Sequence, residues 1–521
     1  MSKQINRLPM LFALALGSVA LGANALGLAA VVDDWPMWGK DETRSMYTTE
    51  SNLPGNFVAG EFKGLSGEID METTENVKWI AKLGSQSYGN PTISNGKVFV
   101  GTNNDTARDE RIQGDYSTVY CFDEATGEFN WQLVVPKLGT GKVSDWEYLG
   151  ICSSPSVEGD RIYLVTNRCE IMCLDVNGLA DGNDGPFQDE AQYVVGPGKE
   201  PLELNDTYAD IIWTTNMIDE CGVFPHNITT SSVLIAGDKL WVTSSNGVDY
   251  GHVETPAPNA PSLVMVDKAT GEILAEEASG LSSRIFHSNW SSPAYLRTDD
   301  FEACIFGGPD GIAYAFSPNP KQSEDGWPVL EELWRYDCNP AEYRVKDGKA
   351  MTYTDRKGPS EILATPVTWD GKVYCVIGQD PEHGEGIGNL VCMNAKGEEL
   401  WSYRKINRSL STMAIGGGLV VAADFSGFVY CLDALTGEEY WVHDTKGHIW
   451  SSPLIADGRV YIGNEDGFLT IIPATKTYDK KSVVEVDMIS PIYSSAVAAN
   501  GTIYITTTSH LFAVANPESG R

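Results

Sequence analysis

The chain has 521 residues, of which 42% are hydrophobic, and it carries a formal net charge of -34 at pH 7. Its 14 Trp, 22 Tyr and 52 Gly exclude a disordered composition and suit short aromatic strands joined by glycine turns. The negative charge repels phosphate backbones, which excludes nucleic acid as a partner. A solvated acidic surface, a cationic partner or cation binding all agree with this charge.

The first 25 residues have the features of a secretory signal peptide. Two basic residues precede the apolar run 8–21, and a small-residue site ends at Ala25, with Ala30 as the alternative cleavage point. No cysteine follows the site, which argues against a lipid anchor, and no later stretch is long and apolar enough to form a transmembrane segment. The sequence therefore predicts a periplasmic or secreted protein.

Residues 26–75 are predicted to be an N-terminal connector, mostly polar. The first regular strand is predicted at 77–82 and contains Trp79. No hairpin precedes it, so we expect it to be the outer strand of a blade whose other strands lie at the far end of the chain.

A repeated unit follows, and its clearest copy runs from Phe428 to Trp441. Alternating apolar residues predict a strand, 433–437 supplies turn residues, and a second strand ends in the tryptophan. Related copies occur at 120–131, 265–274 and 391–401. Such recurrence is the signature of a repeat architecture.

Each unit opens with a step of small residues, often including proline. We find this step eight times, at residues 90, 154, 232, 292, 365, 412, 452 and 495. The later units approach the bare length of a four-stranded propeller blade, and the earlier ones carry loop insertions. The sequence predicts an all-β fold, an eight-bladed β-propeller over 76–517, closed by the N-terminal outer strand and followed by a tail at 518–521.

The ten cysteines fall into two groups. Four occupy the same place in different units and are predicted to be buried rather than bridged: Cys121, Cys173, Cys392 and Cys431. The other six leave room for one or two disulfides of unassigned pairing: Cys152, Cys169, Cys221, Cys304, Cys338 and Cys375.

The unit Asp-x-x-Thr-Gly-x-x-x-Trp, complete at 123–131 and 433–441, resembles the tryptophan-docking repeat of the pyrroloquinoline quinone (PQQ) dehydrogenase propellers. The same repeat occurs in non-enzymatic relatives, including the propeller lipoprotein of the outer-membrane barrel-assembly machinery. The stretch from Trp35 to Gly39 also resembles exported PQQ-like proteins. The resemblance implies the fold and leaves open whether the protein is an enzyme.

Loops that lead into the innermost strands of a propeller surround one mouth of its channel. By resemblance to the quinone enzymes, Trp290 and Trp450 would offer stacking faces for PQQ, Glu361 a metal ligand and Arg408 a contact to the quinone. The expected vicinal cysteine pair is absent from the sequence, and so is a Cys-x-x-Cys-His haem motif.

Three histidines also precede opening steps, namely His226, His287 and His448. A metal site would require them to converge on one ion. Because their offsets from the opening steps differ, we expect hydrogen-bonded histidines in a polar mouth rather than a metal trio.

An acidic insertion begins at Asp175. Oxygen ligands on a turning backbone suit Ca²⁺, but the full EF-hand spacing is missing, so an ordinary acidic turn is the alternative. The candidate Ca²⁺ ligands are Asp175, Asn177, Asp181, Asn183 and Asp184.

The long loops belong to the units between residues 90 and 293, and loops on a rigid scaffold are where function concentrates. We therefore expect a binding or scaffold protein, a monomer or a component of an assembly, that holds a protein partner or small ligand on the long-loop face. The alternative is a PQQ-dependent oxidoreductase acting on an alcohol or sugar.

Overall fold

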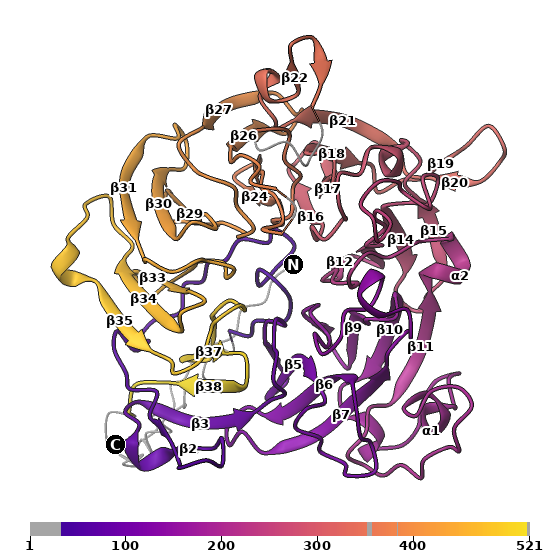
Figure 1. The fold of residues 1–521 in the computed structure, drawn as a ribbon, viewed down its shortest axis with the longest axis vertical. Helices are drawn as coiled ribbons and strands as arrows, with labels where there is room; N and C mark the ends of the chain where they lie inside the picture. Colours follow the sequence, from indigo (N-terminus) through magenta and orange to yellow (C-terminus); the bar gives the residue numbers. More distant parts are fainter. Residues whose placement is uncertain (1–32, 352–356, 383, 518–521) are drawn as a thin grey trace, which may run out of the picture. The chain divides into compact units, whose positions relative to one another are not determined.

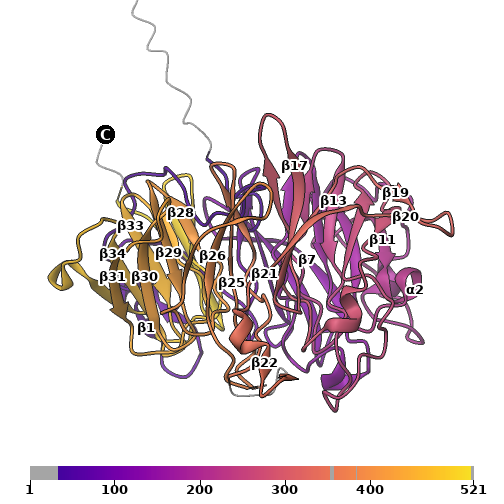
Figure 2. The same ribbon diagram turned by 90° about the horizontal axis from the view of Figure 1, so that it is seen from above.

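The computed structural model describes residues 33–351, 357–382 and 384–517. Within residues 33–521, antiparallel sheets radiate as eight blades around a central axis (Figure 1, Figure 2). This confirms the predicted eight-bladed propeller. The predicted signal peptide and C-terminal tail lie outside the described residues.

The first four blades belong to the half of the ring with the long insertions. Their strands, from the axis outward, are β4 (Thr92–Ser94), β5 (Lys97–Asn103), β6 (Tyr116–Asp123) and β7 (Phe129–Pro136); β8 (Ser156–Glu158), β9 (Arg161–Val165), β10 (Glu170–Asp175) and β11 (Ile211–Asn216); β12 (Leu234–Ala236), β13 (Lys239–Thr243), β14 (Leu263–Asp267) and β15 (Ile273–Glu276); and β16 (Ala294–Arg297), β17 (Glu302–Gly307), β18 (Ile312–Phe316) and β21 (Glu332–Asp337).

The other four blades are closer to the bare unit. Their strands are β24 (Val367–Trp369), β25 (Lys372–Val376), β26 (Leu390–Asn394) and β27 (Glu399–Tyr403); β28 (Ala414–Gly416), β29 (Leu419–Ala423), β30 (Phe428–Asp433) and β31 (Glu439–Asp444); β32 (Leu454–Ala456), β33 (Arg459–Gly463), β34 (Phe468–Pro473) and β35 (Val484–Asp487); and β36 (Val497–Ala499), β37 (Thr502–Thr506), β38 (His510–Val514) and β3 (Val77–Lys82).

Short elements decorate the ring. They are the hairpins β1 (Glu61–Phe62) with β2 (Ile69–Asp70), β19 (Lys321–Gln322) with β20 (Pro328–Val329), and β22 (Val345–Lys346) with β23 (Lys349–Ala350), and the helices α1 (Glu190–Tyr193) and α2 (Met217–Cys221). None of the helices in the described ranges is long and apolar enough to cross a membrane.

Strand β3 closes the ring, as predicted. It pairs antiparallel with β38, with Trp79 opposite Ala513 and Lys82 opposite His510. The N-terminal strand thereby completes the blade made by the last three strands of the chain. Closure gives this blade the same four strands as the others, so β38 is paired on both sides rather than left as an open edge.

Neighbouring blades are joined by docked tryptophans. The indole of Trp441 donates to the Thr475 carbonyl at 2.7 Å, and that of Trp79 donates to the Glu124 carbonyl at 3.0 Å. Each of several tryptophans also lies on the turn glycine of the next blade: a Cβ added to Gly437 would meet the ring of Trp401 at 2.5 Å. The repeated Thr-Gly step is therefore a packing requirement.

A β-bulge recurs beside six of the tryptophans, and four of these six lie opposite a cysteine. Cys121 and Cys431 lie opposite Trp131 and Trp441, and the register shifts immediately after each cysteine. The same pattern holds for Cys173 and for Cys392. All four cysteines are buried, as predicted, and all ten cysteines are free thiols.

Residues 34–50, which belong to the predicted connector, run along the axis of the ring and bind the innermost strands. The innermost strands expose a free backbone edge toward the axis, and buried edges need hydrogen-bond partners. The carbonyl of Pro36 accepts from Val157, and that of Glu42 accepts from Tyr295. Trp35 forms a bridge with Ile93 on yet another blade. We call residues 34–50 the plug.

Arg44 anchors the plug. Its guanidinium is fully buried and donates to the carbonyls of Trp38, Pro293 and Ser232 at 2.7, 2.8 and 3.1 Å. Burial lowers the pKa of Arg44 to about 9. One side chain thus connects the plug to two separate blades.

Candidate functional site

An aromatic pocket of about 360 Å³ lies at one mouth of the channel. Four of its aromatic side chains come from loops that precede innermost strands: Tyr88, Trp146, Trp290 and Trp450. Asp380 and Glu382, from the loop after β25, add two carboxyl groups. We call this cavity the mouth pocket.

Hydrogen bonds hold the rings of the mouth pocket in place. The indole of Trp290 donates to the Ile228 carbonyl at 3.1 Å, and that of Trp450 donates to the Glu465 carboxylate at 2.9 Å. Because the polar edge of each indole is already used, the ring faces are what these residues offer to a ligand.

The mouth pocket is acidic as well as aromatic. Burial, reinforced by the charge of Glu382, raises the pKa of Asp380 to about 6. Among the described residues, neither lysine nor arginine lines this cavity. The chemical surroundings therefore favour a cation over an anion.

The four residues proposed for quinone binding do not share one cavity. Trp290 and Trp450 line the mouth pocket, whereas Arg408 lines a neighbouring cavity of about 360 Å³. Arg408 lies over the ring of Phe425, at 4.8 Å, and donates to the Gly384 carbonyl. Burial lowers the pKa of its guanidinium.

Glu361 lines neither of these two cavities. Its side chain is fully buried, and a carboxylate oxygen lies 4.0 Å from Nδ1 of His287. Burial, followed by the charge of Asp380, raises the pKa of Glu361 well above its usual range. Backbone N–H groups of Ser288 and Asp380 oppose this rise in pKa, and the carboxyl group also faces His287.

The mouth histidines are arranged differently from the expectation based on their offsets. His226 and His287 converge with a third histidine, His252, and their ring nitrogens lie within 4.8 Å of one another. His448 stands apart, bonded through Nδ1 to the Phe425 carbonyl. The sequence pattern does not single out His252, because this residue lies in a loop between β13 and β14, away from any opening step.

The five candidate Ca²⁺ ligands in the acidic insertion make bonds within the protein. Asp175 pairs with Arg161 at 2.6 Å, and the Asn177 amide donates to Asp181 at 2.9 Å. The Asn183 amide donates to a carboxylate of helix α1. Asp184 donates its backbone N–H to another carboxylate at 3.0 Å. Binding of Ca²⁺ by these residues remains a prediction.

The long insertion between β10 and β11 packs on the outside of the ring, where helix α1 lies (Figure 1). Val194 and Tyr208 are buried with Ile112 and Val134 in a small apolar cluster. The backbone of Gln132 also exchanges hydrogen bonds with residues 207 and 209. Deleting residues 179–209, which make up most of this insertion, would therefore expose apolar side chains of the first blade. Partner binding on the long-loop face remains a prediction.

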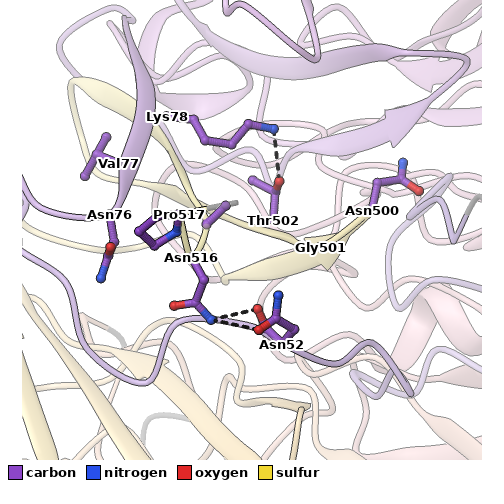
Figure 3. A pocket seen from close by; sticks show the side chains of 10 residues that line it. Asn52, Asn76, Val77, Lys78, Asn500, Gly501, Thr502, Asn516 and Pro517 are labelled. Carbon is purple, nitrogen blue, oxygen red and sulfur yellow. Dashed lines mark hydrogen bonds between the residues drawn. The ribbon is translucent and has the colours of Figure 1, made fainter. Parts of the chain in front are cut away.

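A further cavity, of about 710 Å³, lies where the two ends of the propeller meet (Figure 3). The Asn516 amide donates to the Asn52 carbonyl at 2.8 Å, and Lys78 donates to Thr502 at 3.3 Å. Four of its ten lining residues are asparagines, and most of the lining residues belong to the closing blade or adjoin it. We attribute this cavity to ring closure.

Comparisons with known proteins agree with the fold. The family described as outer membrane protein assembly factor BamB matches residues 386–521. BamB from Moraxella catarrhalis is 14% identical with a TM-score of 0.51, covering 85% of this chain and 98% of its own. A europium-containing methanol dehydrogenase is 12% identical with a TM-score of 0.56, covering 93% and 98%. No curated protein matches the chain. At such identities the shared property is the fold.

Proposed function

We propose that this PQQ-like eight-bladed β-propeller is an exported binding protein whose mouth pocket holds an organic cation with an apolar body. The observation that carries this proposal is the composition of the pocket. Four aromatic side chains and two carboxyl groups surround a space of about 360 Å³. That volume suits a small molecule.

The physical basis is the attraction between a cation and aromatic ring faces. Each such contact contributes roughly 0.5–2 kcal/mol, and more when the cation is shielded from water. Trp290 and Trp450 present their faces because their indole N–H groups are bonded elsewhere. Asp380 and Glu382 add attraction at short range, and the net charge of -34 raises the local concentration of cations.

The test is a titration of the purified chain with phenyltrimethylammonium, followed by tryptophan fluorescence and calorimetry. We expect saturable binding that weakens about tenfold or more in Trp290→Ala and in Glu382→Gln. Asp325→Asn is the matched control, because it removes one exposed acid far along the chain from the pocket residues. Equal weakening in the control would show a general charge effect and contradict the proposal.

The alternative function is PQQ-dependent oxidation of an alcohol or sugar. Stacking faces at Trp290 and Trp450 favour it, as does the fold shared with the methanol dehydrogenase. The charges do not fit, because PQQ is a planar tricarboxylate and the mouth pocket presents Asp380 and Glu382, with Arg408 in the neighbouring cavity. We therefore derive no oxidation step from these residues.

A protein partner is the other form of the binding hypothesis. The fold resemblance to BamB supports it at the level of architecture alone. We rank it below ligand binding because the mouth pocket combines a defined volume with a defined chemistry, whereas the insertion at α1 is largely packed on its own blade.

A further inference from the structure

Three imidazoles meet behind the aromatic wall of the mouth pocket. Nε2 of His226 and Nε2 of His252 are 3.1 Å apart, and one ring nitrogen from each of His226, His252 and His287 lies within 4.8 Å of the others. In a tetrahedral zinc site with Zn–N bonds of about 2.0–2.1 Å, the ligand nitrogens are roughly 3.3 Å apart. The pair His226–His252 is already close to this spacing, and His287 lies within 4.8 Å of both.

The tautomer of His226 is already the one that a metal requires. Its Nδ1 is 2.7 Å from the Val248 carbonyl, which can only accept, so Nδ1 carries the proton and Nε2 presents its lone pair to the cluster. Metal-binding histidines typically donate their second ring N–H to such a carbonyl. Val248 therefore orients His226 for coordination.

Charge balance also supports a metal ion in the histidine cluster. A dication held by three neutral imidazoles needs nearby anions in a buried site. Glu361, fully buried, places a carboxylate oxygen 4.0 Å from Nδ1 of His287. A dication in the cluster would lie beside this buried carboxyl group, which can ionise to balance the charge of the ion.

We propose that His226, His252 and His287 bind a divalent first-row transition metal of the Zn²⁺ class, with Glu361 as the compensating carboxylate. Imidazole ligands suit Zn²⁺, Cu²⁺ and Ni²⁺ and do not suit Ca²⁺. Three protein ligands leave one position of a tetrahedral ion for water or a ligand. The ring of His287 lies 5.0 Å from that of Trp290, which places the metal beside the mouth pocket.

Co²⁺ is the probe of choice, since four-coordinate Co²⁺ gives intense visible absorption bands. We expect the metal-stripped full chain to bind one equivalent of Co²⁺ with these bands and to release it to one equivalent of Zn²⁺. His252→Gln should weaken Zn²⁺ binding at least about tenfold in calorimetry. His252 is partly exposed on a loop, so this variant should keep the fold, which circular dichroism checks.

The matched control is His448→Gln, which removes a histidine of the same mouth that lies outside the cluster. It should bind Co²⁺ as the original chain does. Absence of the visible bands, or equal Zn²⁺ affinity in His252→Gln and the original chain, would overturn the proposal. The test is independent of the organic ligand, so failure of the cation-binding hypothesis would leave its result unaffected.

Discussion

The outer rim and the channel mouth use the same repeat in opposite ways. At the rim, the same contact recurs: a tryptophan lies on the turn glycine of the next blade, as Trp401 does on Gly437 and Trp79 on Gly127. At the mouth, only some of the blades contribute to the pocket and to the histidine cluster, and the side chains that they contribute vary from blade to blade. Repetition builds the scaffold, and departures from repetition build the sites.

The sharpest test of this comparison truncates one tryptophan from each region. Trp441→Ala removes a buried indole between two blades, so we expect the free energy of unfolding to fall by about 3–5 kcal/mol. Trp290 is only partly buried, and Trp290→Ala should cost clearly less while weakening ligand binding. Denaturant unfolding measures both. Equal losses of stability in the two variants would contradict the claim that the rim tryptophan is structural and the mouth tryptophan is not.

The next prediction concerns the turn glycines of the rim. Gly437 has φ +71° and an added Cβ would lie 2.5 Å from the Trp401 ring, so Gly437→Ala should lower the free energy of unfolding by about 2–3 kcal/mol. Gly417 has φ +60° with open space around it, so Gly417→Ala isolates the backbone cost of about 1 kcal/mol. If both variants lose the same amount, tryptophan docking contributes nothing at this turn.

The smallest expected effect is a pH dependence at the closing blade. His510 donates from Nε2 to the Gly67 carbonyl at 3.0 Å, and burial lowers its pKa. The folded state therefore disfavours the protonated form, and the free energy of unfolding should fall as the pH drops below about 6.5. His443, whose pKa is also lowered by burial, adds to this slope.

His510→Gln checks the assignment. Between pH 7 and 5.5 its unfolding free energy should vary less with pH than that of the original chain, because one group that protonates only on unfolding is gone. An unchanged slope would assign the acid sensitivity to other groups.

Much of the fold follows from the sequence because the repeat encodes it. The unit ending at Trp441, its copies and the unpaired strand 77–82 together specify eight blades and their closure. The buried cysteines opposite the tryptophans also follow from the register. The bulge after each cysteine does not, because it inserts no distinctive residue.

The plug and the histidine cluster escape prediction for a common reason: both depend on contacts between parts of the chain that the repeat does not relate. Residues 34–50 have no repeat pattern, yet they supply partners to edges that only the closed ring creates. His252 comes from a loop of one blade and meets His287 from the next opening step. Only two of the four proposed quinone contacts, Trp290 and Trp450, share a pocket.

The most direct test of the proposed function is a calorimetric comparison of two ligands of opposite charge on one preparation. The account predicts that phenyltrimethylammonium binds with one site per chain and that PQQ, with or without Ca²⁺, gives no saturable signal, because Asp380 and Glu382 line the mouth pocket. Saturable binding of PQQ with no binding of the cation would contradict it.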